Sequence, residues 1–185
     1  MPEAAPEAAI VIAQTKKWLS TIVIGHGLCP FAKSEFDNDR IHYAVIDEQN
    51  LEGQMAVLLA ECTALDKDES RETSLLIFPS AFVDFEDYLD GLALANDLLK
   101  DQGYEGIYQL ASFHPHYLFE GAAEDDAANY TNRSPYPIFH ILREANLEAA
   151  LKSYPNPEQI PPRNIELTRR LGLEVMRASL ASCLT

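Results

Sequence analysis

The sequence predicts a single α/β domain over residues 1–185, with a small, mainly parallel sheet of three or four strands packed with helices. Segments typical of strands alternate with segments typical of helices, as they do where helical crossovers join parallel strands. The stretch TSLLIFP, residues 73–79, is continuously apolar, which is typical of a strand buried on both faces. A chain of 185 residues that is 47% hydrophobic can bury one core of this kind.

Local signals justify each element in order. Apolar residues at helical spacing, Trp18 among them, predict the first helix, and the glycines of GHG end it. Asn50 is a suitable N-cap for the second helix, and Gly103 ends the third. The expected elements are a frayed tail over 1–8, helices over 7–24, 50–65, 84–103, 138–152 and 163–181, and strands over 40–46, 73–79 and 106–113.

The connection over residues 114–137 is the longest one expected. Loops beyond about 12–15 residues without secondary structure are uncommon in compact domains unless they have a function. This loop follows the strand over 106–113, so it begins at the carboxyl edge of the sheet, where ligands of parallel sheets gather. It is rich in His, Asp, Asn and Tyr. We therefore expect it to form one wall of a ligand pocket.

The stretch HPHYLFE at the start of this loop predicts acid–base or metal chemistry. At the end of a strand, His114 and His116 would project to the same side, so they could hold a divalent metal ion with Glu120, or else Asp125, Asp126 or His140, as a further ligand. Either histidine could instead act as a general acid or base. The alternative is that both cap the strand and bond to the backbone of the loop.

The stretch TNRSPYP offers groups for binding a substrate. Arg133 presents a planar fork that suits a carboxylate or a phosphate. The alternative is that Arg133 pairs with Asp125 or Asp126 and fixes the loop to itself. The other substrate-binding candidates in this loop are Tyr117, Asn132, Ser134 and Tyr136.

Two later stretches add candidates on predicted helices. In HILRE, His140 is a candidate acid or base and Arg143 a substrate-orienting group, with a helical surface pair as the alternative. In IPPRNIELTRRLG, Arg163 lies at the start of the last helix and could hold an anion with the free backbone N–H groups there. Ion pairing of Arg163 with surface acids is the alternative.

The Gly-rich turn GHGLCPFAK places Cys29 in a polar setting four residues before Lys33. A thiol near a cation can become nucleophilic, so Cys29 is a candidate catalytic residue. Burial as a small apolar residue is the alternative, and it fits Cys62 better than Cys29. Ala32 stands where a C-x-x-C redox pair would have its second cysteine. The chain geometry allows Cys29 to reach the long loop but does not require it.

Composition disfavours several classes of function. The 29 acidic and 14 basic side chains give a formal net charge of −15, which disfavours nucleic acids and anionic membrane surfaces as partners. We find neither a secretory signal nor an apolar run long enough to span a bilayer. Three scattered cysteines suit a reducing cytoplasm. Composition does not predict the oligomeric state.

The strings WLSTIVIGHGLCPFAK, ASFHPHYLFEG, TNRSPYPIFHILRE and IPPRNIELTRRLG resemble a bacterial family known as domain of unknown function 1415. In that family the positions of His26 and Gly27 usually read Leu-Asn, so the resemblance gives His26 no role. It implies a stand-alone bacterial cytoplasmic protein but no reaction.

The residues themselves predict an enzyme acting on a small anionic metabolite, with a polar pocket built from the Cys29 turn and the 114–137 loop. The alternative is a non-catalytic module that binds a metabolite or a protein with the same loop.

Overall fold

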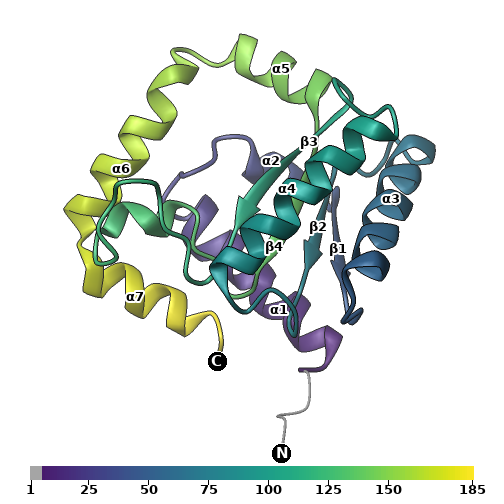
Figure 1. Ribbon diagram of the computed structural model, residues 1–185. Coiled ribbons are helices and arrows are strands. Elements are labelled where there is room, and N and C mark those ends of the chain that lie inside the picture. The colour runs from purple at the N-terminus through teal and green to yellow at the C-terminus, as the bar shows by residue number, and fades with distance from the viewer. Residues whose placement is uncertain (1–5) are drawn as a thin grey trace, which may run out of the picture.

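A computed structural model describes residues 6–185, which form a four-stranded sheet covered by helices on both faces (Figure 1). The strands run in the order β1-β2-β4-β3; β1 and β2 are parallel, and β4 is antiparallel to β2 and to β3. The predicted α/β class is confirmed. The sheet is mixed, so the prediction that it is mainly parallel is not confirmed. The strands are β1 (Ile41–Val45), β2 (Thr73–Ile77), β3 (Tyr108–Phe113) and β4 (Ile138–Arg143).

Each face of the sheet has its own apolar core because side chains alternate along a strand. Leu76 faces the first core, under α3 and α4, and Leu75 and Ile77 face the second. In Figure 1, α4 lies in front of the sheet and α1 and α2 lie behind it. The helices on the two faces are α3 (Leu51–Lys67) and α4 (Phe85–Asp101) on the first, and α1 (Ala8–Trp18), the π-helix η1 (Leu19–Ile24), α2 (Ala32–Asp37) and α7 (Leu173–Ser182) on the second.

Strand β4 corrects the prediction of one helix over 138–152. Residues 138–143 pair with β2 and β3, and the helix α5 (Glu144–Ser153) begins only afterwards. Phe139 and Ile141 point into the first core while Ile138 points into the second, which is strand alternation. Pairing with two neighbouring strands therefore decides the conformation of a segment whose local spacing also suits a helix.

The carboxyl-terminal part differs from the prediction as well. The single helix expected over 163–181 is two helices, α6 (Ile160–Leu171) and α7, separated at Gly172 with φ of 89°. A short 3-10 helix η3 (Pro157–Gln159) precedes α6, so α5 and α6 form an arch at the edge of the molecule (Figure 1). Gly172 adopts a backbone conformation that favours glycine, which permits the break. Helix α2 was not predicted.

The first helix and the long loop are close to the prediction. The predicted helix over 7–24 is α1 continued by the π-helix η1, and the loop over 114–137 contains only the short 3-10 helix η2 (Ala127–Thr131). Residues 1–5 of the predicted tail over 1–8 lie outside the described part of the chain. No helix within residues 6–185 has the length and apolar character needed to cross a membrane.

The long loop is held firmly in place by its own amides and by α1. The buried side chain of Asn129 accepts from the Phe119 N–H and donates to a loop carbonyl at 2.9 Å. Trp18 Nε1 donates to the Arg133 carbonyl at 3.0 Å, and the Tyr136 hydroxyl donates to Gln14. These contacts explain how a segment with little secondary structure packs as part of the domain.

Candidate functional site

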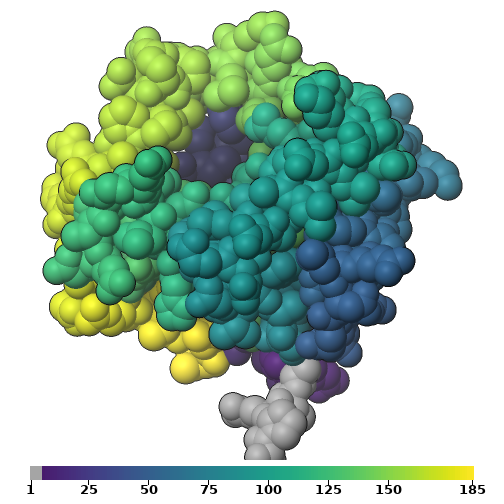
Figure 2. Space-filling view, in the orientation of Figure 1, coloured from purple at the N-terminus to yellow at the C-terminus, as the bar shows by residue number. Residues whose placement is uncertain are grey.

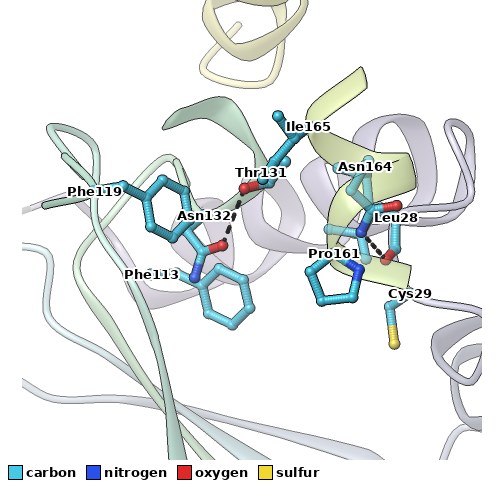
Figure 3. A pocket seen from close by; sticks show the side chains of 10 residues that line it. Leu28, Cys29, Phe113, Phe119, Thr131, Asn132, Pro161, Asn164 and Ile165 are labelled. Carbon is cyan, nitrogen blue, oxygen red and sulfur yellow. Dashed lines mark hydrogen bonds between the residues drawn. The ribbon is translucent and has the colours of Figure 1, made fainter. Parts of the chain in front are cut away.

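A cavity of about 290 Å³ lies where the Cys29 turn, the end of β3, the long loop and α6 meet. We call it the Cys29 cavity. Figure 3 shows Cys29 and Pro161 on one side of it and Phe113 and Asn132 on the other. Figure 2 shows a hollow between the yellow-green atoms of α5 and α6 and the green atoms of the long loop, with dark purple atoms at its floor. Phe119, Thr131 and Asn132 of the long loop form one wall of this cavity.

Helix α6 holds the Cys29 turn in position. The turn closes when the Leu28 N–H donates to the Val23 carbonyl at 2.8 Å, with Gly27 at φ of 66°. Asn164 Nδ2 on α6 donates to the Leu28 carbonyl at 2.6 Å, and the Arg163 guanidinium donates to the Gly27 carbonyl at 2.9 Å. Two consecutive residues of α6 thus satisfy two carbonyls that the end of η1 leaves free.

Cys29 is the accessible cysteine of the chain. Cys62 and Cys183 are fully buried, whereas Cys29 is partly exposed and lines the cavity. Burial, with Asp66 and Glu61 nearby, raises the pKa of Cys62 to about 12, so that thiol stays protonated. Cys29 is therefore the thiol that a small molecule entering this cavity would meet.

Few polar groups line the Cys29 cavity, and most of them are already engaged. Asn132 Nδ2 donates to the Ser112 carbonyl at 3.0 Å, and the Thr131 hydroxyl lies 3.2 Å from Asn132 Oδ1. Asn164 Oδ1 is buried without a hydrogen-bond partner among residues 6–185. The remaining walls come from the apolar side chains of Val23, Leu28, Phe113, Phe119, Pro161 and Ile165.

His114 has a structural role outside this cavity. It is fully buried, its Nε2–H donates to the Phe82 carbonyl at 2.8 Å, and its Nδ1 accepts from the His116 backbone N–H at 3.0 Å. Burial is the main cause that lowers the pKa of His114. Both ring nitrogens are occupied by backbone groups, one in the long loop (His116) and one in the segment after β2 (Phe82), whereas the alternative interpretation had both histidines bonding to the loop backbone.

The structure does not form the metal set of His114, His116 and Glu120. His116 and Glu120 are exposed, and His114 has no free nitrogen to offer a metal ion. Over the described residues, no three His, Cys, Asp or Glu side chains gather closely enough to hold a metal ion. The His-x-His spacing failed because the chain turns at Pro115 instead of continuing the strand.

His140 lies on β4 and not on a helix, so the helical surface pair considered for HILRE does not form. The Thr73 hydroxyl donates to the Ile141 carbonyl and accepts from His140 Nε2–H at 2.7 Å. Burial lowers the pKa of His140 to about 4, so the ring is neutral at pH 7. His140 does not line the Cys29 cavity; its ring centroid lies 6.2 Å from that of Phe113, which does.

The other loop candidates fix the loop rather than face the cavity. Arg133 donates to the carbonyls of Tyr117 and Glu124 at 3.1 and 3.2 Å, so it fixes the loop through carbonyls and not through Asp125 or Asp126. Asp126 instead pairs with Arg169, whose hydrogen bond lowers the pKa of that carboxyl to about 2. The remaining three side chains, also bound within the domain, are Tyr117 (hydroxyl 3.4 Å from that of Ser112), Ser134 (to the Tyr136 carbonyl) and Tyr136 (to Gln14).

The predicted arginines Arg143 and Arg163 lie apart. Arg143 ends β4 at the edge of the sheet opposite the carboxyl ends of β1, β2 and β3, where it donates to the carbonyls of Leu65, Asp68 and Arg71. It therefore closes the end of α3 and cannot orient a ligand in the Cys29 cavity. Arg163 lies beside the cavity but is engaged with the Gly27 carbonyl and the Tyr154 hydroxyl.

The model of the family described as Protein of unknown function (DUF1415) matches residues 10–178. The chain belongs to this family. The match includes all the segments that form the Cys29 cavity, so the cavity lies within the part of the chain that defines the family. No curated protein matches the chain, and no solved structure matches it. Membership of DUF1415 therefore brings no activity with it.

Sequence reasoning missed the contribution of α6 to this DUF1415 site. It selected Arg163 in IPPRNIELTRRLG, but Asn164 and Ile165 line the cavity and Arg163 does not. A signal was present, because Asn164 and Thr168 are four residues apart and are the two buried residues of α6. Polar residues repeated on the buried face of a helix indicate contacts with backbone groups elsewhere in the fold.

Proposed function

We propose that this protein binds a small, largely uncharged organic molecule in the Cys29 cavity. The observation that supports this best is the composition of the walls: mostly apolar side chains, a few amide and hydroxyl groups, and one accessible thiol. Sites for small molecules are typically concave and mostly apolar, with a small number of polar groups that orient the ligand. A volume of about 290 Å³ suits a ligand of modest size.

An uncharged ligand replaces the anionic metabolite that the arginines suggested. No Lys or Arg lines this cavity in the part of the chain that the structure describes. The nearby guanidinium of Arg163 is committed to the Gly27 carbonyl. The formal net charge of −15 opposes an anion in the absence of a local cation.

A second candidate is a thiol-dependent enzyme, because Cys29 is the accessible thiol and lies in the cavity wall. Its thiolate would bond to an electrophilic carbon of the bound molecule. No His, Asp, Glu or Lys among residues 6–185 lines the cavity to accept the thiol proton. Binding without catalysis therefore ranks first.

The cellular compartment and the partners that we propose follow from the cysteines and the net charge. Three free cysteines favour a reducing cytoplasmic compartment. The strongly acidic charge disfavours nucleic acid and leaves the small molecule as the expected partner.

Alkylation of Cys29 by two maleimides of different apolar size tests the proposal. The rates with N-phenylmaleimide and N-ethylmaleimide are measured on the protein, each divided by its rate with glutathione. If the cavity binds apolar groups beside the thiol, the normalised rate is higher for the phenyl compound by about threefold or more. Cys29→Ser confirms the labelled site, because the other two cysteines are fully buried.

A matched pair of variants locates the preference. Ile165→Trp fills the cavity and removes the phenyl preference, whereas Ile10→Trp on the exposed side of α1 leaves it unchanged. Equal normalised rates for both maleimides on the wild-type protein would contradict the proposed function.

A further inference from the structure

A second cavity, of about 390 Å³, lies between the amino-terminal halves of α3 and α4, at the carboxyl edge of β1 and β2. We call it the α3–α4 cavity. Its apolar walls include Leu51 on α3, Leu94 on α4 and Phe82 in the loop after β2. Leu51 and Leu94 are each 42% exposed, so apolar surface remains uncovered at the mouth. Carboxyl edges of parallel strands are common places for ligands.

The wall made by Phe82 is rigid and strained. Phe82 has φ of 55°, a conformation that is costly for a bulky residue and that clusters at binding sites. Its carbonyl accepts from His114, and its ring packs on Phe78 and Phe139 at centroid distances of 5.0 and 5.4 Å. A Cβ at Gly91 would lie 2.4 Å from the Phe82 ring, so this glycine makes room for the ring. The long loop, through His114, thus fixes one wall of the α3–α4 cavity.

The polar groups of the α3–α4 cavity are mainly acceptors. Gln54 is only 3% exposed; its Nε2 donates to the Glu48 carbonyl at 2.9 Å, and its Oε1 has no hydrogen-bond partner within the described chain. This oxygen is not one of the fully enclosed unpaired atoms of the described chain, so it is open to a donor that enters the cavity. Asp87 and Asp90 are one helical turn apart on α4 and form no ion pair within residues 6–185.

The two helix starts at this edge do not favour an anion. Asn50 Oδ1 accepts from the Gly53 N–H at 2.8 Å, and the Asp84 carboxylate accepts from the Glu86 N–H at 2.9 Å. Side chains therefore already cap the backbone donors that would bind an anion. Among the described residues, no Lys, Arg or His lines this cavity to oppose Asp87 and Asp90.

We propose that the α3–α4 cavity binds an organic cation, an ammonium or guanidinium group carried on an apolar body. The cationic head donates to Gln54 Oε1, Asp87 and Asp90, and the apolar body packs between Phe82, Leu51 and Leu94. A free amine and the Lys or Arg side chain of a peptide share this chemistry. The site is separate from the Cys29 cavity and does not depend on the function proposed for it.

Methyl NMR titration of Leu51 and Leu94 tests this proposal with benzylamine as the cationic probe and benzyl alcohol as its neutral counterpart. At low ionic strength benzylamine binds at least about tenfold more tightly, because the carboxylates attract its charge. The double variant Asp87→Asn, Asp90→Asn, at two exposed positions, removes the preference for benzylamine over benzyl alcohol. Asp97→Asn with Asp101→Asn carries the same charge change on exposed positions of α4 outside the cavity and retains it.

A second arm separates the two sources of the cation. An acetylated and amidated tripeptide with a central Lys binds more tightly than benzylamine if a partner protein supplies the group, and more weakly if a free amine does. Either order supports the site. Equal binding of benzylamine and benzyl alcohol, unchanged binding in the Asp87/Asp90 variant, or no binding of either cationic probe at millimolar concentration would overturn the proposal.

Discussion

The Cys29 cavity and the α3–α4 cavity lie on opposite faces of one sheet and have opposite chemistry. Among the described residues, the first is lined by apolar side chains and a thiol and by no carboxylate. The second has two carboxylates and an unpaired amide oxygen beside an aromatic ring. A protein with a formal net charge of −15 keeps its acidic groups out of one cavity and gathers them at the other. The net charge therefore does not predict the ligand of either cavity, and the local lining does.

The largest expected effect comes from His114, which belongs to the long loop but supports the α3–α4 cavity. His114→Ala removes a fully buried ring and leaves the Phe82 carbonyl and the His116 N–H without their partner. We expect a loss of about 3–4 kcal/mol in the free energy of unfolding, measured in urea. Exposed His116→Ala should cost less than about 0.5 kcal/mol.

The same variant sharpens the comparison of the two cavities. If it remains folded, His114→Ala weakens benzylamine binding by releasing Phe82, while the maleimide preference at Cys29 stays as in the wild type. A loss of the maleimide preference with benzylamine binding intact would show that His114 serves the other cavity.

The second-largest expected effect concerns His140, whose titration should make the free energy of unfolding depend on pH. Burial lowers its pKa from 6.5 to about 4, so between these values the unfolded chain binds more protons than the native state. The stabilisation is fully present above about pH 6.5 and is lost as the pH falls toward 4, by about 3 kcal/mol. His140→Gln should flatten this part of the profile, and an equally steep profile in both proteins would exclude His140 as the cause.

Asn164 is expected to have a smaller effect, confined to the Cys29 cavity. Asn164→Ala removes the donor to the Leu28 carbonyl and should lower the free energy of unfolding by about 2 kcal/mol. The loosened turn should also reduce the phenyl preference of Cys29, with benzylamine binding unchanged. Exposed Arg170→Ala on the same helix is the control, and matching behaviour of the two variants would refute the role of Asn164.

The smallest expected effect is that of salt on ligand binding. It distinguishes the two cavities without any mutation. Raising the ionic strength screens Asp87 and Asp90, which are exposed, so the affinity for benzylamine should fall about two- to threefold. The ratio of normalised maleimide rates at Cys29 should not change, since both reagents are neutral. A salt-dependent maleimide ratio would indicate charge in the cavity that we describe as apolar.

Much of the fold is readable from sequence because the signals are local. The Asn50 cap lies within its own helix, and the apolar run of β2 reflects burial on both faces. Strand β4 cannot be predicted in this way, because the spacing of Phe139, Ile141 and their neighbours also suits a helix. Only pairing with β2 and β3 determines that this segment is a strand. The break at Gly172 likewise depends on how α7 packs against the second core.

The candidate site is only partly readable for the same reason. Cys29 and the long loop stand out because a thiol in a Gly-rich turn and a polar loop of unusual length are visible in the sequence. That they share a cavity depends on α6 returning along the arch from α5, which places Asn164 beside Leu28 across 136 positions of the chain. The two hydrogen bonds of the His114 ring, to the Phe82 carbonyl and from the His116 N–H, depend on the turn at Pro115 and on the position of Phe82. No spacing rule predicts them.

Methyl NMR of the wild-type protein with benzyl alcohol, observed at Val23, Leu28 and Ile165, tests whether the Cys29 cavity binds a small uncharged molecule. These three side chains line the Cys29 cavity. We predict saturable shifts at all three, which N-phenylmaleimide bound to Cys29 abolishes. Methyl signals at these residues that stay unmoved by benzyl alcohol up to its solubility limit would contradict the proposal that this cavity binds small uncharged molecules.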